Sequence, residues 1–340
     1  MWIIGCDFHP GFQQIAYVDT RTGECESMRL GHSNGEAERF YRGLGGEAVR
    51  VGMEATGCFR WFQRLLAELG QELWLGDAAR IRAAAAHKAK TDKRDAELLR
   101  QLLIEERFPR IFVPSLEQRD SRQLVLHRHR LVQIRTRIKN QVQALAMNEG
   151  LQRKHRLWSA EGRQQLLQLD LSKWGARRRE DLLALLEQMN MRIEPLDEAV
   201  KAAAEAKPEV KRLMSHPGVG PIVSLAYVLT MGDPHRFHNS RQVAAYFGLV
   251  PREQSSGGHQ RLGHITKQGN ALMRALLVEA AHVAIRHDDG LHRRYLRLAM
   301  KKNRSIAAVA IARHLAVRLW WMWKLGLDYG QMLQSCSHAE

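Results

Sequence analysis

The sequence predicts an α/β domain followed by a basic helical arm and a mainly helical C-terminal region. Three observations carry this prediction. Short β-branched and aromatic runs alternate with amphipathic segments over residues 1–110, Lys and Arg are concentrated over residues 107–180, and helical periodicity dominates thereafter. The 340-residue chain is long enough for about two domains and a full core. We divide it into residues 1–110, 111–206 and 207–335.

The N-terminal region is expected to form a sheet covered by helices. The predicted strands are residues 2–9, 15–18, 25–30, 48–54 and 72–75, and the predicted helices are residues 36–44, 59–69, 78–87 and 92–106. Three successive strands followed by alternating helix and strand is the order of a ribonuclease-H-like sheet. That order predicts Asp7 in mid-sheet, Glu54 at the end of a neighbouring strand, and the 92–106 helix across both.

Four carboxylates gather in this arrangement. Asp92 and Asp95 are three residues apart, which places both on one face of a helix. Together with Asp7 and Glu54 they could hold two divalent metals, and oxygen ligands without a Cys/His site favour Mg²⁺, with Mn²⁺ as a substitute. The Asp pair alone has another explanation, because Asp92 as an N-cap and Asp95 in the first turn would stabilise the helix by about 1 kcal/mol. The two strand carboxylates favour the metal site.

The charge of the chain predicts a polyanionic partner. The formal net charge is +16 and the pI about 10.1. Residues 107–180 hold 17 Lys and Arg against 6 Asp and Glu, so +11 of the total lies there. A solvated basic surface is the alternative. No run approaches the roughly 18 apolar residues of a membrane span, and no signal peptide or paired cysteine spacing is evident. We therefore expect a cytoplasmic, nucleoid-associated protein without a membrane partner.

Two long periodic runs predict the helical arm. Apolar residues recur every three or four positions over residues 116–149 and again over residues 186–200, which is typical of a coiled-coil seam. Pro195 should kink or divide the second helix. The runs could pair as an antiparallel arm or join another subunit, and an ordinary helical bundle is the alternative. We predict that the nucleic-acid backbone binds Arg128, Arg130, Arg135, Arg137, Lys139, Arg177, Arg178 and Arg179.

The C-terminal region contains two glycine-rich segments between predicted helices at residues 222–231, 240–247, 271–286 and 304–325. In residues 216–221, Gly218 and Gly220 could present backbone N–H groups to a phosphate, although a tight helix connection explains them equally well. Residues 248–270 combine glycines and small hydroxyls with the cations Arg252, Arg261 and Lys267. A serine on such a loop could attack a phosphodiester, but most Ser-Ser-Gly-Gly stretches are only loops.

Several motifs together resemble one known family. Residues 5–7 (GCD), 52–57 (GMEATG) and 90–96 (KTDKRDA) resemble the RuvC-like domain of the DEDD-type insertion-sequence transposases. Residues 216–220 (HPGVG), 248–251 (GLVP), 256–258 (SGG) and 266–270 (TKQGN) resemble their C-terminal transposase domain. The two sets occur in the family's order and span nearly the whole chain.

The resemblance implies a recombinase that cuts and rejoins donor and target DNA, guided by a structured noncoding bridge RNA. By motif it implies Mg²⁺ ligands at Asp7, Glu54, Asp92 and Asp95 and a nucleophile at Ser256, with Ser255 as the neighbouring alternative. It further implies a homodimer or homotetramer. Two other functions stay open: a metal-dependent RuvC-like junction resolvase or nuclease that uses water as nucleophile, and a non-catalytic nucleic-acid-binding scaffold.

Overall fold

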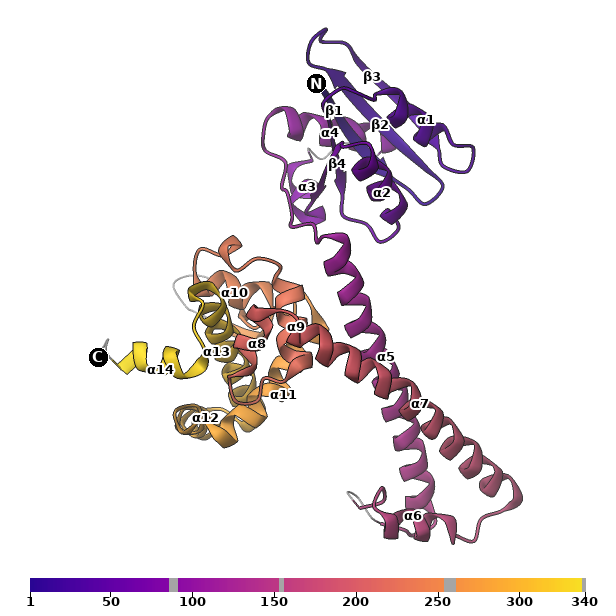
Figure 1. The fold of residues 1–340 in the computed structure, drawn as a ribbon, viewed down its shortest axis with the longest axis vertical. Helices are drawn as coiled ribbons and strands as arrows, with labels where there is room; N and C mark the ends of the chain where they lie inside the picture. The colour runs from indigo at the N-terminus through magenta and orange to yellow at the C-terminus, as the bar shows by residue number, and fades with distance from the viewer. Residues whose placement is uncertain (86–90, 153–155, 254–260, 338–340) are drawn as a thin grey trace. The chain divides into compact units, whose positions relative to one another are not determined.

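A computed structural model describes residues 1–85, 91–152, 156–253 and 261–337. Its backbone contacts divide the chain into two compact units, Met1–Pro114 and Ser115–Glu340. The first unit is mixed α/β and the second is mainly helical, as the sequence predicts (Figure 1). Assignment of the first unit to the RuvC-like fold remains a prediction, as does the three-part division of the chain.

The first unit is built on a five-stranded sheet with β1 at its centre. Its strands are β1 (Trp2–Phe8), β2 (Phe12–Asp19), β3 (Cys25–Gly31), β4 (Val49–Glu54) and β5 (Glu72–Gly76). The spatial order is β3-β2-β1-β4-β5, in which β1, β2 and β3 pair antiparallel and β1, β4 and β5 pair parallel. Its helices are α1 (Glu36–Gly43), α2 (Arg60–Glu68), α3 (Ala78–Ala84) and α4 (Asp92–Ile104).

Successive residues of a strand point to opposite faces of the sheet, and different helices pack on the two faces. Ile4 and Cys6 point into a core shared with α1 and α2, whereas Ile3 packs on the side of α3 and α4. On the α4 side, three strands carry glycine: Gly5 pairs with Gly52, and Gly76 lies on the next strand. We call these three residues the glycine row. A Cβ at Gly5 would meet helix backbone 2.2 Å away, and one at Gly52 a leucine methyl at 2.7 Å, so the row permits the close approach of α4 and the segment that follows it.

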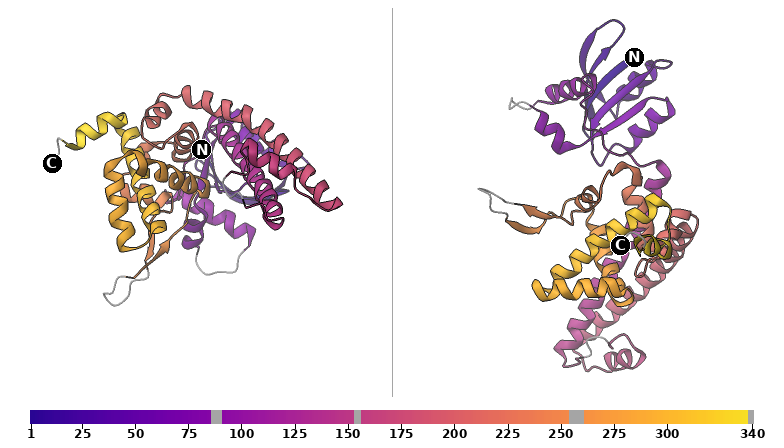
Figure 2. Two further views of the ribbon diagram at one scale, coloured as in Figure 1. Left: turned by 90° about the horizontal axis from the view of Figure 1, so that it is seen from below. Right: turned by 90° about the vertical axis from the view of Figure 1, so that its left-hand side faces the viewer.

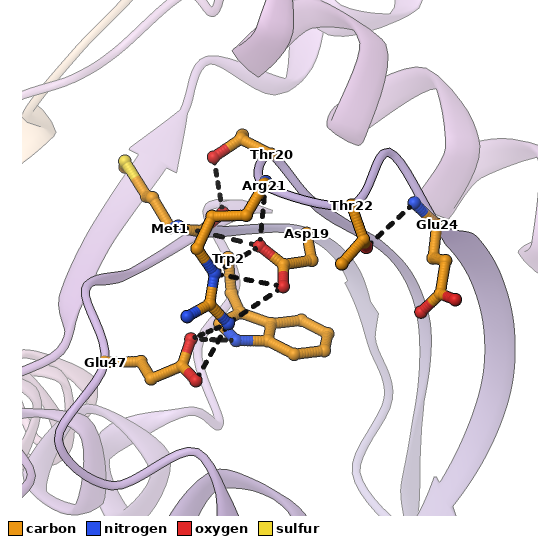
Figure 3. Close-up of polar contacts among 8 residues, drawn as sticks. All are labelled: Met1, Trp2, Asp19, Thr20, Arg21, Thr22, Glu24 and Glu47. Carbon is orange, nitrogen blue, oxygen red and sulfur yellow. Dashed lines mark hydrogen bonds and ion pairs between the residues drawn. The ribbon is translucent and has the colours of Figure 1, made fainter.

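An ion-pair network closes the opposite end of the sheet from Asp7 (Figure 3). The Arg21 guanidinium bonds Asp19 at 2.9 Å and Glu47 at 2.8 Å, and the Trp2 indole N–H also donates to Glu47. Hydrogen bonds from Arg21 hold the pKa of Asp19 at about 2. These carboxylates are neutralised by an arginine, so the network ties the β2–β3 turn to the loop before β4.

Two helices of 33 residues form the arm in the second unit, α5 (Leu116–Asn148) and α7 (Lys173–Glu205), joined through the short α6 (Ala160–Leu167). They pack side by side with opposite chain directions (Figure 1). Buried Ile138, Val142 and Leu186 form one part of their contact. The coiled-coil geometry itself remains a prediction.

Pro195 does not divide α7, contrary to one of the two outcomes expected for it. Proline removes one backbone donor from a helix, but the turns on either side are anchored by Ile193 and Val200, which are buried. Packing of these flanking turns therefore carries the helix through the proline.

The remaining helices surround one large core. They are α8 (Pro208–Met214), α9 (Pro221–Met231), the 3₁₀ turn η1 (Pro234–Arg236), α10 (Ser240–Tyr246), α11 (Ala271–His287), α12 (Asp289–Lys301), α13 (Arg304–Leu325) and α14 (Tyr329–Ser337). Trp320 is fully buried in this core and its indole N–H donates to the Pro234 carbonyl at 2.8 Å, so this tryptophan is a packing residue. Among the described residues, no helix is both long and apolar enough to span a bilayer.

A two-stranded hairpin stands where the sequence predicts only a loop. β6 (Pro251–Glu253) and β7 (Leu262–Ile265) pair antiparallel and project from the helices of this unit (Figure 2). Short pairing segments of this kind are hard to predict because three or four residues carry too little periodicity.

Candidate functional site

Asp7 reaches the α4 side of the sheet from the end of β1. It shares the face of Gly5, two residues earlier, and a Cβ on Gly5 would lie 2.2 Å from the Ala96 carbonyl oxygen in α4. The Asp7 side chain is only 22% exposed. The α4 helix therefore passes directly over the residues that lead to Asp7.

Glu54 ends the neighbouring parallel strand on the same face. Cys6 pairs with Met53 across β1 and β4, so Asp7 and Glu54 are the next residues of the two strands. Glu54 is half-buried and pairs on its other side with Gly76. Two carboxylates therefore lie at adjacent strand ends. Open α/β sheets bind their ligands at the carboxyl ends of their strands.

Asp92 and Asp95 occupy the first turn of α4, and Thr91 is the N-cap. The Thr91 hydroxyl accepts from the Arg94 backbone N–H at 3.3 Å. The alternative in which Asp92 caps the helix is therefore wrong, because the cap position is already filled. Asp92 remains about half exposed, which leaves its carboxylate available to a ligand.

His9 also lies at this site, and it is not among the residues predicted from the sequence. Its Nε2 atom lies 3.2 Å from an Asp7 oxygen and 3.7 Å from an Asp92 oxygen. One ligand atom from each of the three residues lies within 4.8 Å of the others. The signal in the sequence is the spacing Asp7-Phe8-His9, which puts aspartate and histidine on one face at the end of a strand. Glu54 and Asp95 are not part of this three-residue cluster.

Electrostatics around Asp7 favour a bound cation. Burial is the main cause that raises the pKa of the Asp7 carboxyl above its ordinary value. Asp95 and Asp92 raise it further by repulsion, while His9 lowers it. Because Asp95 acts on Asp7, it belongs to the same electrostatic environment even outside the tight cluster. A divalent cation would relieve this repulsion, and the oxygen donors fit Mg²⁺ or Mn²⁺.

In the second unit, the β6–β7 hairpin holds three of the predicted binding cations. Arg252 follows the start of β6 and Arg261 precedes β7, while Lys267 follows β7 with φ of 57°. The base of the hairpin is closely packed, since a Cβ on Gly248 would lie 2.1 Å from the Gln268 carbonyl oxygen. The candidate nucleophile Ser256 and its neighbour Ser255 lie outside the described residues.

The glycines of residues 216–221 have different surroundings. Gly218 adopts φ of 81°, and a Cβ there would lie 2.4 Å from the Ala280 carbonyl oxygen of α11. It therefore seats the turn against the core. Gly220 is the exposed N-cap of α9 and its Cβ position is open. The predicted phosphate contact suits Gly220 better than Gly218, and it remains a prediction for both.

Buried polar groups hold this turn in place. The His216 ring lies 4.5 Å from the Tyr329 ring, and burial lowers the pKa of His216 to about 4. The Tyr329 hydroxyl donates to Asp288, which also forms an ion pair with Arg318 at 2.6 Å. These contacts join the residue 216–221 turn to α12, α13 and α14.

Several of the arm cations are engaged within the arm. Arg128 forms an ion pair with Asp197 at 2.7 Å, which links α5 to α7. Arg179 donates to three carbonyls at the end of α6, Arg177 pairs with Asp181, and Lys139 lies over the Trp158 ring. Arg135 donates to Asn190. The described residues give no such partner to the exposed side chains of Arg130, Arg137 and Arg178.

Comparison with known proteins covers both units. Residues 210–297 match the model described as "Transposase IS116/IS110/IS902 family", and residues 4–148 match a model described as a transposase of the IS110 DEDD type. A protein of Pseudomonas aeruginosa described as "Probable family 20 transposase" is 31% identical over 326 residues, which cover 93% of this chain and 95% of that protein. The "Transposase for insertion sequence element IS1111A" of Coxiella burnetii is 31% identical over 68% of this chain and 66% of its own length.

Proposed function

The chain belongs to the IS116/IS110/IS902 transposase family, and from this premise we propose that it cuts and rejoins donor and target DNA through a covalent serine–DNA intermediate. The family is described by its transposase function. The observation that supports a metal-assisted chemistry is the cluster of Asp7, His9 and Asp92 at the start of α4. The serine step rests on the motif resemblance.

In this proposal the first unit supplies the metal half of the site. Asp7 and Asp92 would hold Mg²⁺, with Glu54 and Asp95 completing the carboxylate set from the adjacent strand end and the same helical turn. When bound, the ion would supply positive charge that offsets the charge on the reacting phosphate. His9 orients the Asp7 carboxylate, which it contacts at 3.2 Å.

The second unit supplies the nucleophile, Ser256. Its Oγ forms a bond to phosphorus as the phosphodiester bond to one strand end breaks, and the hydroxyl proton passes to the departing oxygen by way of a base. The energy of the broken bond is conserved in the serine phosphoester, so rejoining by reversal needs no external energy source. Arg252, Arg261 and Lys267 flank the loop and would offset the charge that develops on the phosphate.

A structured noncoding RNA and a second copy of the chain complete the proposal. The net charge of +16 suits a large amount of bound nucleic acid. The exposed arginines of the arm would contact its backbone without reading sequence. A homodimer or homotetramer would bring together metal and serine halves from different copies.

The alternative is a metal-dependent nuclease or junction resolvase that uses water as nucleophile. The carboxylate cluster favours it as much as the transposase mechanism, because that cluster lies within one unit and needs no serine. The two mechanisms differ in one product, since only attack by serine leaves protein joined to DNA.

To test this difference, labelled DNA is incubated with the protein, Mg²⁺ and RNA transcribed in vitro from the DNA that flanks its gene, and the products are separated on a denaturing gel. We expect a labelled protein band from the wild type and from Ser255→Ala, and none from Ser256→Ala or Asp7→Asn. Cleavage at the wild-type rate by Ser256→Ala would support water as the nucleophile. Loss of the band only in Ser255→Ala would identify the neighbouring serine instead.

A further inference from the structure

A second concentration of positive charge lies outside the arm. Residues 290–327 contain nine Lys and Arg and no Asp or Glu. This density exceeds that of the arm, where acidic residues are interspersed. The stretch spans most of α12 and all of α13, including the turn between them. Its exposed cations are Arg293, Arg294, Arg297, Lys301, Lys302, Arg304 and Arg313.

Five of these cations lie along α12 and at the turn that leads into α13. Arg293, Arg297 and Lys301 are spaced by four residues, so they follow one another along one side of the helix. Lys302 and Arg304 follow directly in the chain, as the C-cap of α12 and the first residue of α13, and both are exposed. We call these five residues the α12 face. From Arg293 to Lys301 the helix rises about 12 Å. One strand of duplex DNA has one phosphate for about every 3.4 Å of the duplex axis, so this length corresponds to about three to four phosphates.

The α12 face is mounted on a rigid support. Asp288 caps α12 by accepting from the Leu291 backbone N–H at 2.9 Å, and its other oxygen bonds Arg318. Leu291 is buried, and α12 packs against both α11 and α13. A helix fixed at its N-terminal end and along one side presents its cations in a constant geometry.

Nothing within the described part of the chain neutralises this face. None of its five cations has an ion-pair or hydrogen-bond partner among those residues. Like charges at i,i+4 destabilise a helix, so the pairs Arg293/Arg297 and Arg297/Lys301 are unfavourable for α12 by itself. The favourable position of Lys301 near the negative end of the helix dipole explains one cation but not the row.

We propose that the α12 face is a docking surface for the phosphate backbone of duplex DNA, an inference that rests on the proposed function. Charge complementarity selects the partner, because a row of unneutralised cations matches a row of phosphates and lowers the repulsion within α12. An anionic membrane surface is the competing partner for a basic helix. It fits less well, because among the described residues the large, apolar and exposed side chains beside these cations are Leu296, Met300 and Ile306, too few for the broad apolar face of an interfacial helix.

The test measures binding of the full-length protein to a fluorescent duplex DNA of arbitrary sequence at several NaCl concentrations. The variant Arg293→Gln/Arg297→Gln/Lys301→Gln keeps good helix formers in α12. The control Arg192→Gln/Lys201→Gln/Arg241→Gln removes the same charge from three exposed cations elsewhere in the unit. Duplex RNA of the same sequence and vesicles of anionic phospholipid are the comparison ligands.

We expect the α12 variant to bind duplex DNA at least about tenfold more weakly at moderate salt, with a slope of log K against log salt that is shallower by about 3. The control should change the slope much less. An unchanged slope, an equal loss in the control, or a loss confined to RNA or to vesicles would overturn the α12 proposal while leaving the transposase proposal standing. A wild-type protein that binds no DNA would overturn both.

Discussion

Replacing Gly5 by alanine should separate the two halves of the carboxylate site. The new Cβ would lie 2.2 Å from the Ala96 carbonyl oxygen and 2.3 Å from the Arg100 backbone nitrogen, and ordinary contact begins at 3.4 Å. Both atoms belong to the backbone of α4, so no side-chain rotation can relieve the clash. The helix must retreat from the sheet by about 1 Å, and Asp92 and Asp95 would move with it.

The magnitude follows from this displacement. Overpacking of this kind costs about 1–3 kcal/mol of stability, so the protein should remain folded at moderate temperature. Misplacement of a catalytic group by 1 Å can lower a rate about 100-fold. We therefore expect Gly5→Ala to lose about two orders of magnitude in Mg²⁺-dependent DNA cleavage, with a higher Mg²⁺ requirement. Initial rates over a Mg²⁺ titration, together with thermal unfolding by circular dichroism, measure both effects.

Gly11→Ala is the matched control, because a Cβ at this exposed glycine of the same unit meets nothing within 4 Å. It should cleave like the wild type. If Gly5→Ala cleaves at the wild-type rate with the wild-type Mg²⁺ requirement, then close packing of α4 does not set the carboxylate spacing. Equal losses in both variants would also refute the reasoning.

Three further predictions address the other parts of the molecule. Asp92→Asn and Asp95→Asn should each abolish cleavage without changing the circular dichroism spectrum, and full activity in excess chelator would remove the carboxylates from the mechanism. In the arm, Arg178→Gln should flatten the salt dependence of nucleic-acid binding by about one unit of slope, whereas Arg179→Gln should mainly lower the unfolding temperature, because Arg179 holds carbonyls of α6. Burial lowers the pKa of His216 to about 4 from an ordinary 6.5, so the unfolded chain takes up the proton first. Stability should therefore be lost as pH falls from 6.5 toward 4, by on the order of 3 kcal/mol, and urea unfolding of His216→Gln should show a weaker dependence on pH.

The sequence predicts elements best where one pattern dominates. β1 alternates between two buried faces, and α13 runs from its cap at Asn303 to a left-handed Gly326, as its periodicity and flanking residues predict. The helix α12 is not among the predicted helices, although Leu291, Tyr295 and Leu298 recur at helical spacing and all three pack on the core. The cations between them mask this apolar stripe in the sequence, and packing against α11 and α13 makes it evident.

In the candidate site, too, some residues could be predicted from the sequence and others could not. Asp92 and Asp95 could be proposed from their spacing, and Asp7 and Glu54 from their places after apolar strands. His9 is not predicted, because the Asp7-Phe8-His9 spacing is a weak signal by itself and gains meaning only when the fold brings the histidine within 3.2 Å of Asp7. The filling of the cap position by Thr91 likewise became evident only from its hydroxyl contact in the structure.

The glycine row has a consequence for how copies of this gene decay. Every missense change in a glycine codon adds at least one carbon atom. A Cβ at Gly5 would lie 2.2 Å from the backbone of α4, whereas the nearest atoms to a Cβ at Gly52 or Gly76 are methyl groups of Leu103 and Ile81, which are side-chain ends. A copy with a changed Gly5 codon can therefore keep all four carboxylate codons and still encode a protein whose helix α4 no longer fits its sheet. The inheritance of an intact element would then depend on a position where no atom can be added, as well as on the four proposed metal ligands.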